Sequence, residues 1–175
     1  MVLLVIDVQT AITVPELYAF GRFSRNLKTL LNAARSSGTE VIYVRHDDGA
    51  GKPLTAGQPG FEIAQGFAPQ QGERIFDKRV NSPFRDSGLR EYLQERGETT
   101  LMITGLQTEY CIDAAVKCGF EHGFTVIVPV YANTTFSDAY MSGEQIYRYF
   151  NDHIWPDRYA KCVPVSDAVR MMQKK

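Results

Sequence analysis

The sequence lacks an excess of charge of either sign. Its 175 residues include 19 lysines and arginines against 20 aspartates and glutamates, which gives a net charge of −1. A protein that binds nucleic acid or an anionic membrane usually carries a basic patch that neutralises phosphate groups. The lysines and arginines are scattered along this chain rather than clustered. We therefore expect neither nucleic acid nor a membrane as a partner.

Cysteine is scarce as well. The chain has three, at Cys111, Cys118 and Cys162, and no two of them have the CxxC spacing of a metal or redox motif. If Cys111 and Cys118 share a helix, the rise of the helix places them too far apart for a disulfide. Reduced thiols are typical of a reducing compartment, so the sequence predicts a cytoplasmic protein.

Long hydrophobic runs are also absent. The N-terminal MVLLVI is short, has no basic flank and runs directly into Asp7, which argues against a signal peptide or a spanning helix. The segment after it, VQTAIT, lacks the glycines of a nucleotide-binding turn. We find no repeat, low-complexity tract or linker. With 44% hydrophobic residues, the chain is predicted to form a single domain over residues 1–175.

Short apolar runs alternate with segments of helical periodicity. VLLVID, TEVIYVRH, ERIFDK, TTLMITGL, FTVIVPVYA and KCVPV have the composition of strands. Strands that are apolar throughout and alternate with helices indicate a parallel sheet covered on both faces. The sequence therefore predicts one doubly wound α/β domain with a six-stranded, mostly parallel sheet in the order 3-2-1-4-5-6.

This strand order brings particular residues together. Strands one and four lie side by side at the point where the order reverses, which is where such sheets bind ligands. Asp7 ends strand one, and the loop TGLQTEYC leads from strand four to Cys111. A Gly-rich loop from Asp47 to about Gly72 is long for a compact domain, and covering a site would explain its length.

Three residues in this arrangement can carry chemistry, although each has an ordinary structural interpretation. Cys111 is either a small buried residue or a nucleophile whose pKa the start of a helix lowers. Asp7 can cap a loop or act as a base, and Lys78 can be a solvated surface residue or the partner of a carboxylate. Together they supply a thiol, a base and a cation, which is the set that nucleophilic catalysis by cysteine needs.

The segments VIDVQ, VIYVRHDDG, DKRVNSPF, GLQTEYCIDAA and GFTVIVPVYANTTF, in this order and spacing, resemble the isochorismatase-like cysteine hydrolases. That family includes nicotinamidases and ureido-acid amidohydrolases, and the resemblance covers nearly the whole chain. It implies that Asp7 is the general base, Lys78 the catalytic lysine and Cys111 the nucleophile. It also implies a cis peptide between Leu106 and Gln107, with the N–H groups of Gln107 and Cys111 forming an oxyanion hole.

The resemblance implies a cysteine hydrolase that cleaves a C–N bond of a small amide or ureido compound through a Cys111 thioester. Two alternatives stay open. One is hydrolysis of a vinyl ether with Asp7 as the acid, as in true isochorismatases, some of which do without the cysteine. The other is a binding or redox-sensing domain in which Cys111 is an oxidisable thiol.

Several residues in or beside the matching motifs are candidates for a substrate pocket. They are Gln9, His46, Phe84, Tyr110 and Phe136. A small pocket with apolar walls and few polar anchors would use aromatic residues in this way. The aromatic rings are equally suited to filling the core, because large aromatics are commonly buried in any domain.

We expect no metal and no other cofactor. Nicotinamidases of the family bind a metal through an Asp-x-His pair and a second histidine, whereas the corresponding loop here reads RHDDGAG. A ligand set of His46, Asp47 and Asp48 has suitable chemistry, but adjacent residues on a strand point to opposite faces. The other histidines are His122 and His153. Activity is therefore expected to survive chelation.

The last third of the chain is rich in aromatic residues, which are Tyr147, Tyr149, Phe150 and Trp155. Such residues are enriched in subunit interfaces, and homo-oligomers are common. The expected partners are thus a small-molecule substrate and further copies of the chain, as a dimer or a tetramer.

Overall fold

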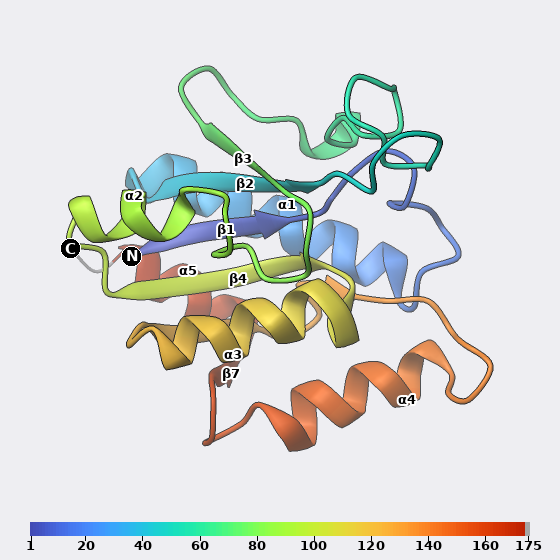
Figure 1. Ribbon diagram of the computed structural model, residues 1–175. Helices are drawn as coiled ribbons and strands as arrows, with labels where there is room; N and C mark the ends of the chain where they lie inside the picture. Colours follow the sequence, from blue (N-terminus) through green and yellow to red (C-terminus); the bar gives the residue numbers. More distant parts are fainter. Residues whose placement is uncertain (174–175) are drawn as a thin grey trace.

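A computed structural model describes residues 1–173 of the chain. The helices and strands alternate along nearly the whole of this range, as Figure 1 shows. In chain order they are β1 (Val2–Ile6), α1 (Phe20–Ser37), β2 (Glu40–His46), η1 (Gln65–Phe67), β3 (Arg74–Lys78), α2 (Leu89–Glu95), β4 (Thr100–Leu106), η2 (Thr108–Ile112), α3 (Asp113–Glu121), β5 (Thr125–Pro129), β6 (Asn133–Thr134), α4 (Gly143–Arg148), η3 (Tyr149–Ile154), β7 (Lys161–Val163) and α5 (Val165–Gln173).

The strands form one parallel sheet in the order β3-β2-β1-β4-β5-β7, which confirms the predicted doubly wound order. The prediction of six strands was short by one. The two-residue strand β6 pairs with the end of β4, at Gly105 and Leu106. β5 pairs with β4 only as far as Ile127, and Pro129 near its end has no N–H to donate. After β5 the chain comes back beside β4 as β6. A strand of two residues is too short for a hydrophobic pattern to reveal it in the sequence.

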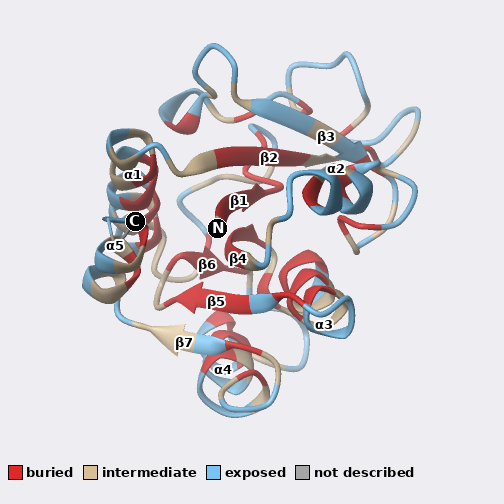
Figure 2. Cartoon of the chain, turned by 90° about the vertical axis from the view of Figure 1, so that its left-hand side faces the viewer, coloured by how far each residue is buried: buried red, intermediate tan, exposed pale blue. Residues whose placement is uncertain are grey.

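Helices cover both faces of the sheet, as Figure 2 shows with α1 and α5 on one side and α2 and α3 on the other. The strand β1 is buried on both faces, and its side chains alternate between two cores. Leu3 and Val5 lie in the core that includes Phe23 and Leu27 of α1. Leu4 and Ile6 lie in the opposite core with residues of α2 and α3. This two-sided burial is the reason that the sequence of β1 is apolar throughout.

The helix α1 follows directly from its apolar periodicity. The positions at spacings of three and four, which are Phe23, Leu27, Leu30, Leu31 and Ala34, are all buried. Gly38 ends the helix in the left-handed conformation with φ of 71°, where glycine has no Cβ to clash. Its backbone N–H reaches the carbonyls of Ala34 and Arg35 in the last turn of the helix.

The long connection between β2 and β3 is held against the segment that follows β1. The N–H of Ala64 donates to the carbonyl of Val8 at 2.9 Å, and the N–H of Thr10 donates to that of Glu62 at 2.8 Å. Leu54, in the middle of the connection, is buried. Figure 1 shows the connection beyond the carboxyl ends of β1 and β2, where the ligand site of such a sheet lies.

Most of the aromatic side chains in the last third are used inside the chain. Tyr147 and Trp155 are buried, and Nε1 of Trp155 donates to Asp113 at 2.9 Å. Phe150 packs against the core, and Tyr149 is the one of the four that is exposed. These four residues therefore do not form a single exposed surface, and the oligomeric state stays a prediction. Among residues 1–173, no helix has the length and apolarity to cross a membrane.

Candidate active site

Three elements deliver the candidate catalytic side chains to one edge of the sheet. Asp7 follows β1, Lys78 is the last residue of β3, and Cys111 lies in the π-helical turn η2 after β4. The N–H of Asp7 donates to the carbonyl of Val44 in β2 at 2.9 Å, which fixes the backbone there. Because parallel strands end at the same edge, residues from distant parts of the chain meet at this point.

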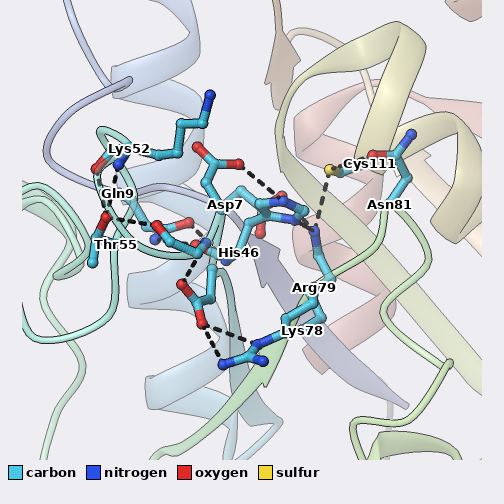
Figure 3. Close-up of polar contacts among 12 residues, drawn as sticks. Asp7, Gln9, His46, Lys52, Thr55, Lys78, Arg79, Asn81 and Cys111 are labelled. Atoms are coloured by element: carbon cyan, nitrogen blue, oxygen red, sulfur yellow. Dashed lines mark hydrogen bonds and ion pairs between the residues drawn. The ribbon is translucent and has the colours of Figure 1, made fainter.

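The ammonium group of Lys78 joins the other two side chains, as Figure 3 shows. Its Nζ lies 2.8 Å from Oδ2 of Asp7 and 3.2 Å from Sγ of Cys111. All three residues are buried, and the Lys78 side chain has no exposed surface. A buried ion pair of this kind interacts strongly because little water screens it.

Burial has the largest effect on the pKa values of the Cys111 thiol and the Asp7 carboxyl group. It raises the pKa of Cys111 to about 12, and the neighbouring negative charge of Asp7 adds to this effect. Burial also raises the pKa of Asp7, although the Lys78 ammonium opposes the shift. At neutral pH the resting thiol is therefore protonated, and it needs a base before it can attack.

This result corrects one expectation from the sequence. The interpretation of Cys111 as a nucleophile placed it at the start of a helix that lowers its pKa. Gln107 occupies the cap position of η2 without a side-chain hydrogen bond to the turn, and the hydroxyl of Thr108 donates to Asn133 at 2.7 Å. Burial outweighs any favourable effect of the turn on the thiolate.

The two carboxylate oxygens of Asp7 have different surroundings. Oδ2 accepts from Lys78, whereas Oδ1 is buried and has no hydrogen-bond partner among residues 1–173. A carboxylate oxygen of Asp7 lies within 4.8 Å of Sγ of Cys111. A buried acceptor without a partner is costly, and it is well suited to receive a proton from a neighbouring group.

His46 completes the surroundings of Lys78. Its Nδ1 lies 3.1 Å from Nζ of Lys78, and its Nε2 lies 3.1 Å from Oδ1 of Asp48. An ammonium group has only donors, so Nδ1 must accept. The proton of the neutral ring is then on Nε2, the nitrogen that faces Asp48. Lys78 thus uses its three N–H groups on Asp7, Cys111 and His46.

The same geometry decides how well this site fits a metal. In the described part of the chain, Asp7, His46 and Cys111 are the one group of ligand-type residues whose atoms come within 4.8 Å of one another. Lys78 is hydrogen-bonded to all three, so its ammonium group takes the place that a metal ion bound by these residues would need. The carboxylate of Asp47 points away and binds Arg79 at 3.0 Å. These residues do not fit a metal centre.

A cavity of about 210 Å³ opens over the cluster. Six of its residues were singled out in the sequence: Asp7, His46, Gln107, Tyr110 and Cys111 as site residues, and Asp48 as a possible metal ligand. The other three, Ile12, Leu54 and Asn81, were not. Asn81 follows Lys78 by three residues, and its Oδ1 lies 3.8 Å from the thiol of Cys111. That spacing within the DKRVNSPF motif was the available signal for Asn81.

The other proposed pocket residues lie elsewhere. Phe84 stacks on Phe124 in the core, with 6.1 Å between ring centroids, and Phe136 packs against the opposite core. Gln9 is fully buried and binds backbone at both ends of its amide, accepting from the N–H of His46 at 2.8 Å. Leu106 is buried, and its peptide bond to Gln107 is cis, as the resemblance implies.

A hydrogen-bonded network supports the turn that carries Cys111. Thr108 donates to Asn133, whose amide nitrogen donates to Asn151 at 2.9 Å. The hydroxyl of Thr135 donates to Glu109 at 2.8 Å. The segment containing β6 therefore holds η2 in place, and it lies on the side of β4 that faces away from β1.

Comparison with known proteins agrees with this architecture. Residues 1–149 match the family model described as the Isochorismatase domain. The chain belongs to the isochorismatase family. Its curated relatives in this family of hydrolases include amidohydrolases. A streptothricin hydrolase of Streptomyces noursei is 32% identical over 139 residues, which cover 77% of this chain and 49% of that protein. The match thus spans about half the length of that relative.

The chain is also similar to a further curated protein and to a solved structure. The maleamate amidohydrolase of Pseudomonas putida is 31% identical, with 72% of this chain and 68% of that protein covered. A solved hydrolase of the isochorismatase family from Chromobacterium violaceum is 25% identical and superimposes with a TM-score of 0.89, covering 98% and 92% of the two chains. The fold of this isochorismatase-family protein is therefore shared over almost its full length.

Proposed function

We propose that this protein is a cysteine hydrolase that cleaves a C–N bond of a small amide or ureido compound. The observation that carries the proposal is the bonding of one buried ammonium group, that of Lys78, to both Asp7 and Cys111 beneath a cavity. Relatives that are named as amidohydrolases support the kind of bond that is cleaved and say nothing of the charge of this protein's substrate. The cavity is smaller than the roughly 300–1,000 Å³ of sites for drug-sized ligands, which favours a small substrate.

The first half of the proposed reaction forms a thioester. Asp7 accepts the proton of the Cys111 thiol through its free oxygen, and the sulfur attacks the carbonyl carbon of the substrate. Lys78 already contacts the sulfur, so it stabilises the negative charge as the proton leaves. The raised pKa of Asp7 makes this carboxylate a stronger base than an exposed aspartate.

The second half releases the products. We assign the backbone N–H groups of Gln107 and Cys111 to the oxyanion, because Gln107 and the nucleophile line the same cavity. Protonated Asp7 returns its proton to the leaving ammonia or amine as the C–N bond breaks. Asp7 then accepts a proton from the water that attacks the thioester. The C–S bond breaks, the acid product leaves, and the proton on Asp7 returns to the sulfur, which restores the free thiol.

The experiment is a screen of purified protein against primary amides, ureido acids and isochorismate, with ammonia and pyruvate as the readouts. Ammonia release together with a mass adduct on the Cys111 peptide supports the proposal. The raised pKa of Asp7 also suits a general acid. Pyruvate release that persists in Cys111→Ala would therefore replace the amidase proposal with acid-catalysed ether cleavage by Asp7. If none of these substrates reacts and Cys111 instead oxidises reversibly, the sensing alternative takes its place.

A further inference from the structure

The charged groups around the cavity are predominantly acidic. Of the nine residues that line it, two are aspartates, Asp7 and Asp48, and none is a lysine or an arginine. Ile12 and Leu54 add apolar surface, and the exposed ring of Tyr110 stands beside them. A substrate in this cavity therefore meets carboxylates and apolar groups, without a cation on its wall.

Two cations close to the cavity, Lys78 and Arg79, already have partners. The ammonium of Lys78 has bonded its three N–H groups to Asp7, His46 and Cys111, which leaves it no donor for a substrate carboxylate. Arg79 lines a separate cavity of about 390 Å³, where it pairs with the carboxylate of Asp47 at 3.0 Å.

The two aspartates of the wall differ in how far their charge is compensated. Asp7 is paired with the Lys78 ammonium. Oδ1 of Asp48 lies 3.1 Å from Nε2 of His46, and that ring is neutral because its Nδ1 accepts from the Lys78 ammonium. The side chain of Asp48 is 35% exposed and lines the cavity, and no lysine or arginine of residues 1–173 forms an ion pair with it.

We propose that Asp48 sets the charge selectivity of this site, so that it admits uncharged and cationic compounds and rejects anionic ones. This inference rests on the proposed function for its substrates, which would be neutral or cationic amides or ureido compounds. A like charge facing an uncompensated carboxylate at contact range is disfavoured by roughly tenfold or more in rate or affinity. For cationic compounds, the rate or affinity should increase by a comparable factor.

The first experiment needs no substrate. It measures the rate at which Cys111 reacts with two methanethiosulfonates of similar size, the trimethylammonioethyl and the sulfonatoethyl derivative, each relative to a free thiol in solution. Peptide mass spectrometry assigns the modification to Cys111. The normalised rate with the cationic reagent should exceed that with the anionic reagent by roughly tenfold or more. An equal or reversed ratio would overturn the proposal.

A pair of variants separates Asp48 from the general charge of the protein. Asp48→Asn should reduce the cationic-to-anionic ratio at Cys111 several-fold, whatever its effect on the absolute rates. The matched control is Asp86→Asn, which changes the net charge equally, because Asp86 is 89% exposed and lines the separate cavity with Arg79. The ratio should remain unchanged in this control. A ratio that moves equally in both variants would contradict a role specific to Asp48.

The second experiment compares hydrolysis of three amides of similar length, which are pentanamide, γ-aminobutyramide and succinamate. We expect kcat/KM for the neutral and cationic amides to exceed that for succinamate by roughly tenfold or more, and Asp48→Asn to narrow this gap. Preferred hydrolysis of succinamate would overturn the charge selectivity while leaving the amidase proposal intact. If no amide is hydrolysed but the reagents still discriminate by charge, the proposed function fails and the selectivity of the site stands.

Discussion

The ammonium nitrogen of Lys78 lies 2.8 Å from Oδ2 of Asp7, although 71 residues separate the two in the sequence. Their strands, β3 and β1, are not neighbours in the sheet, because β2 lies between them. The pairing therefore depends on a long side chain that reaches past the end of β2. Once paired, the two residues place a base and a cation against Cys111, and the predictions below test this arrangement.

Cys111→Ala should abolish hydrolysis of every amide, with a loss on the order of 1,000-fold or more, because the covalent path is lost. The free energy of unfolding should change by no more than about 2 kcal/mol, since one small side chain is shortened. Initial rates and urea denaturation measure the two effects. Cys118→Ala and Cys162→Ala serve as controls that should retain activity. Comparable losses in all three variants would mean that the thiol at position 111 has no special role.

Asp7→Asn should remove activity and yet make the Cys111 thiol easier to ionise. The negative charge of Asp7 contributes to the raised pKa of this thiol, so its removal lowers that pKa below about 12. Ultraviolet absorbance of the thiolate during a pH titration measures the shift, with Cys111→Ala as the blank. A thiol pKa that stays unchanged or rises in Asp7→Asn would show that the two groups do not interact as described.

The wild-type enzyme should lose kcat/KM on the acidic side at a higher pH than an ordinary aspartate would give. The base must be deprotonated to accept the thiol proton, and burial raises the pKa of Asp7. The acidic limb of the profile therefore lies above 3.8, the ordinary pKa of an aspartate side chain. The measurement uses a substrate that does not titrate in this range. An acidic limb at or below the ordinary pKa of aspartate would exclude Asp7 as the group that titrates.

Lys78→Met should destabilise the fold by about 3–5 kcal/mol at neutral pH, because it leaves the Asp7 carboxylate buried without its cation. The raised pKa means that the folded protein binds the Asp7 proton more tightly than the unfolded chain does. The destabilisation is therefore smallest below the unfolded pKa and grows as the pH rises through the folded pKa. The double variant Asp7→Asn/Lys78→Met should regain much of the stability without regaining activity. Urea denaturation across a pH series that shows no such recovery would contradict the pairing.

Exhaustive treatment with EDTA should leave activity unchanged, because the Lys78 ammonium fills the cation position among Asp7, His46 and Cys111. Metal analysis of the treated protein and initial rates before and after treatment provide the measurement. Loss of turnover that added zinc restores would instead make these three residues metal ligands.

Gly105→Ala should destabilise the protein by more than about 2 kcal/mol or prevent folding. A Cβ at Gly105 would lie 1.9 Å from the carbonyl oxygen of Ile6, immediately before Asp7. Gly123→Ala is the matched control, since its φ is also positive but a Cβ there meets no atom within 4 Å. Thermal or urea unfolding of both variants separates the contact from the backbone conformation. Equal effects would show that the close approach of β4 to β1 is unimportant.

The sequence by itself determined the local elements and the identity of the main candidates. Apolar runs in β1 and the three-and-four spacing in α1 are local patterns, and burial on both faces of a sheet or on one face of a helix produces them directly. The motifs around Asp7, Lys78 and Cys111 indicated the cluster because strand ends in a doubly wound sheet meet at one edge.

The tertiary structure decided what the side chains touch. Phe84 lies in the core while Asn81, three residues earlier, lines the cavity, because the path of the loop after β3 sets their directions and no periodic pattern records it. Burial depends on every neighbouring element, so only the folded chain could show that the pKa of Cys111 is raised rather than lowered. The orientation of Asp48 toward His46 likewise follows from contacts across β2 and β3, which sequence spacing does not encode.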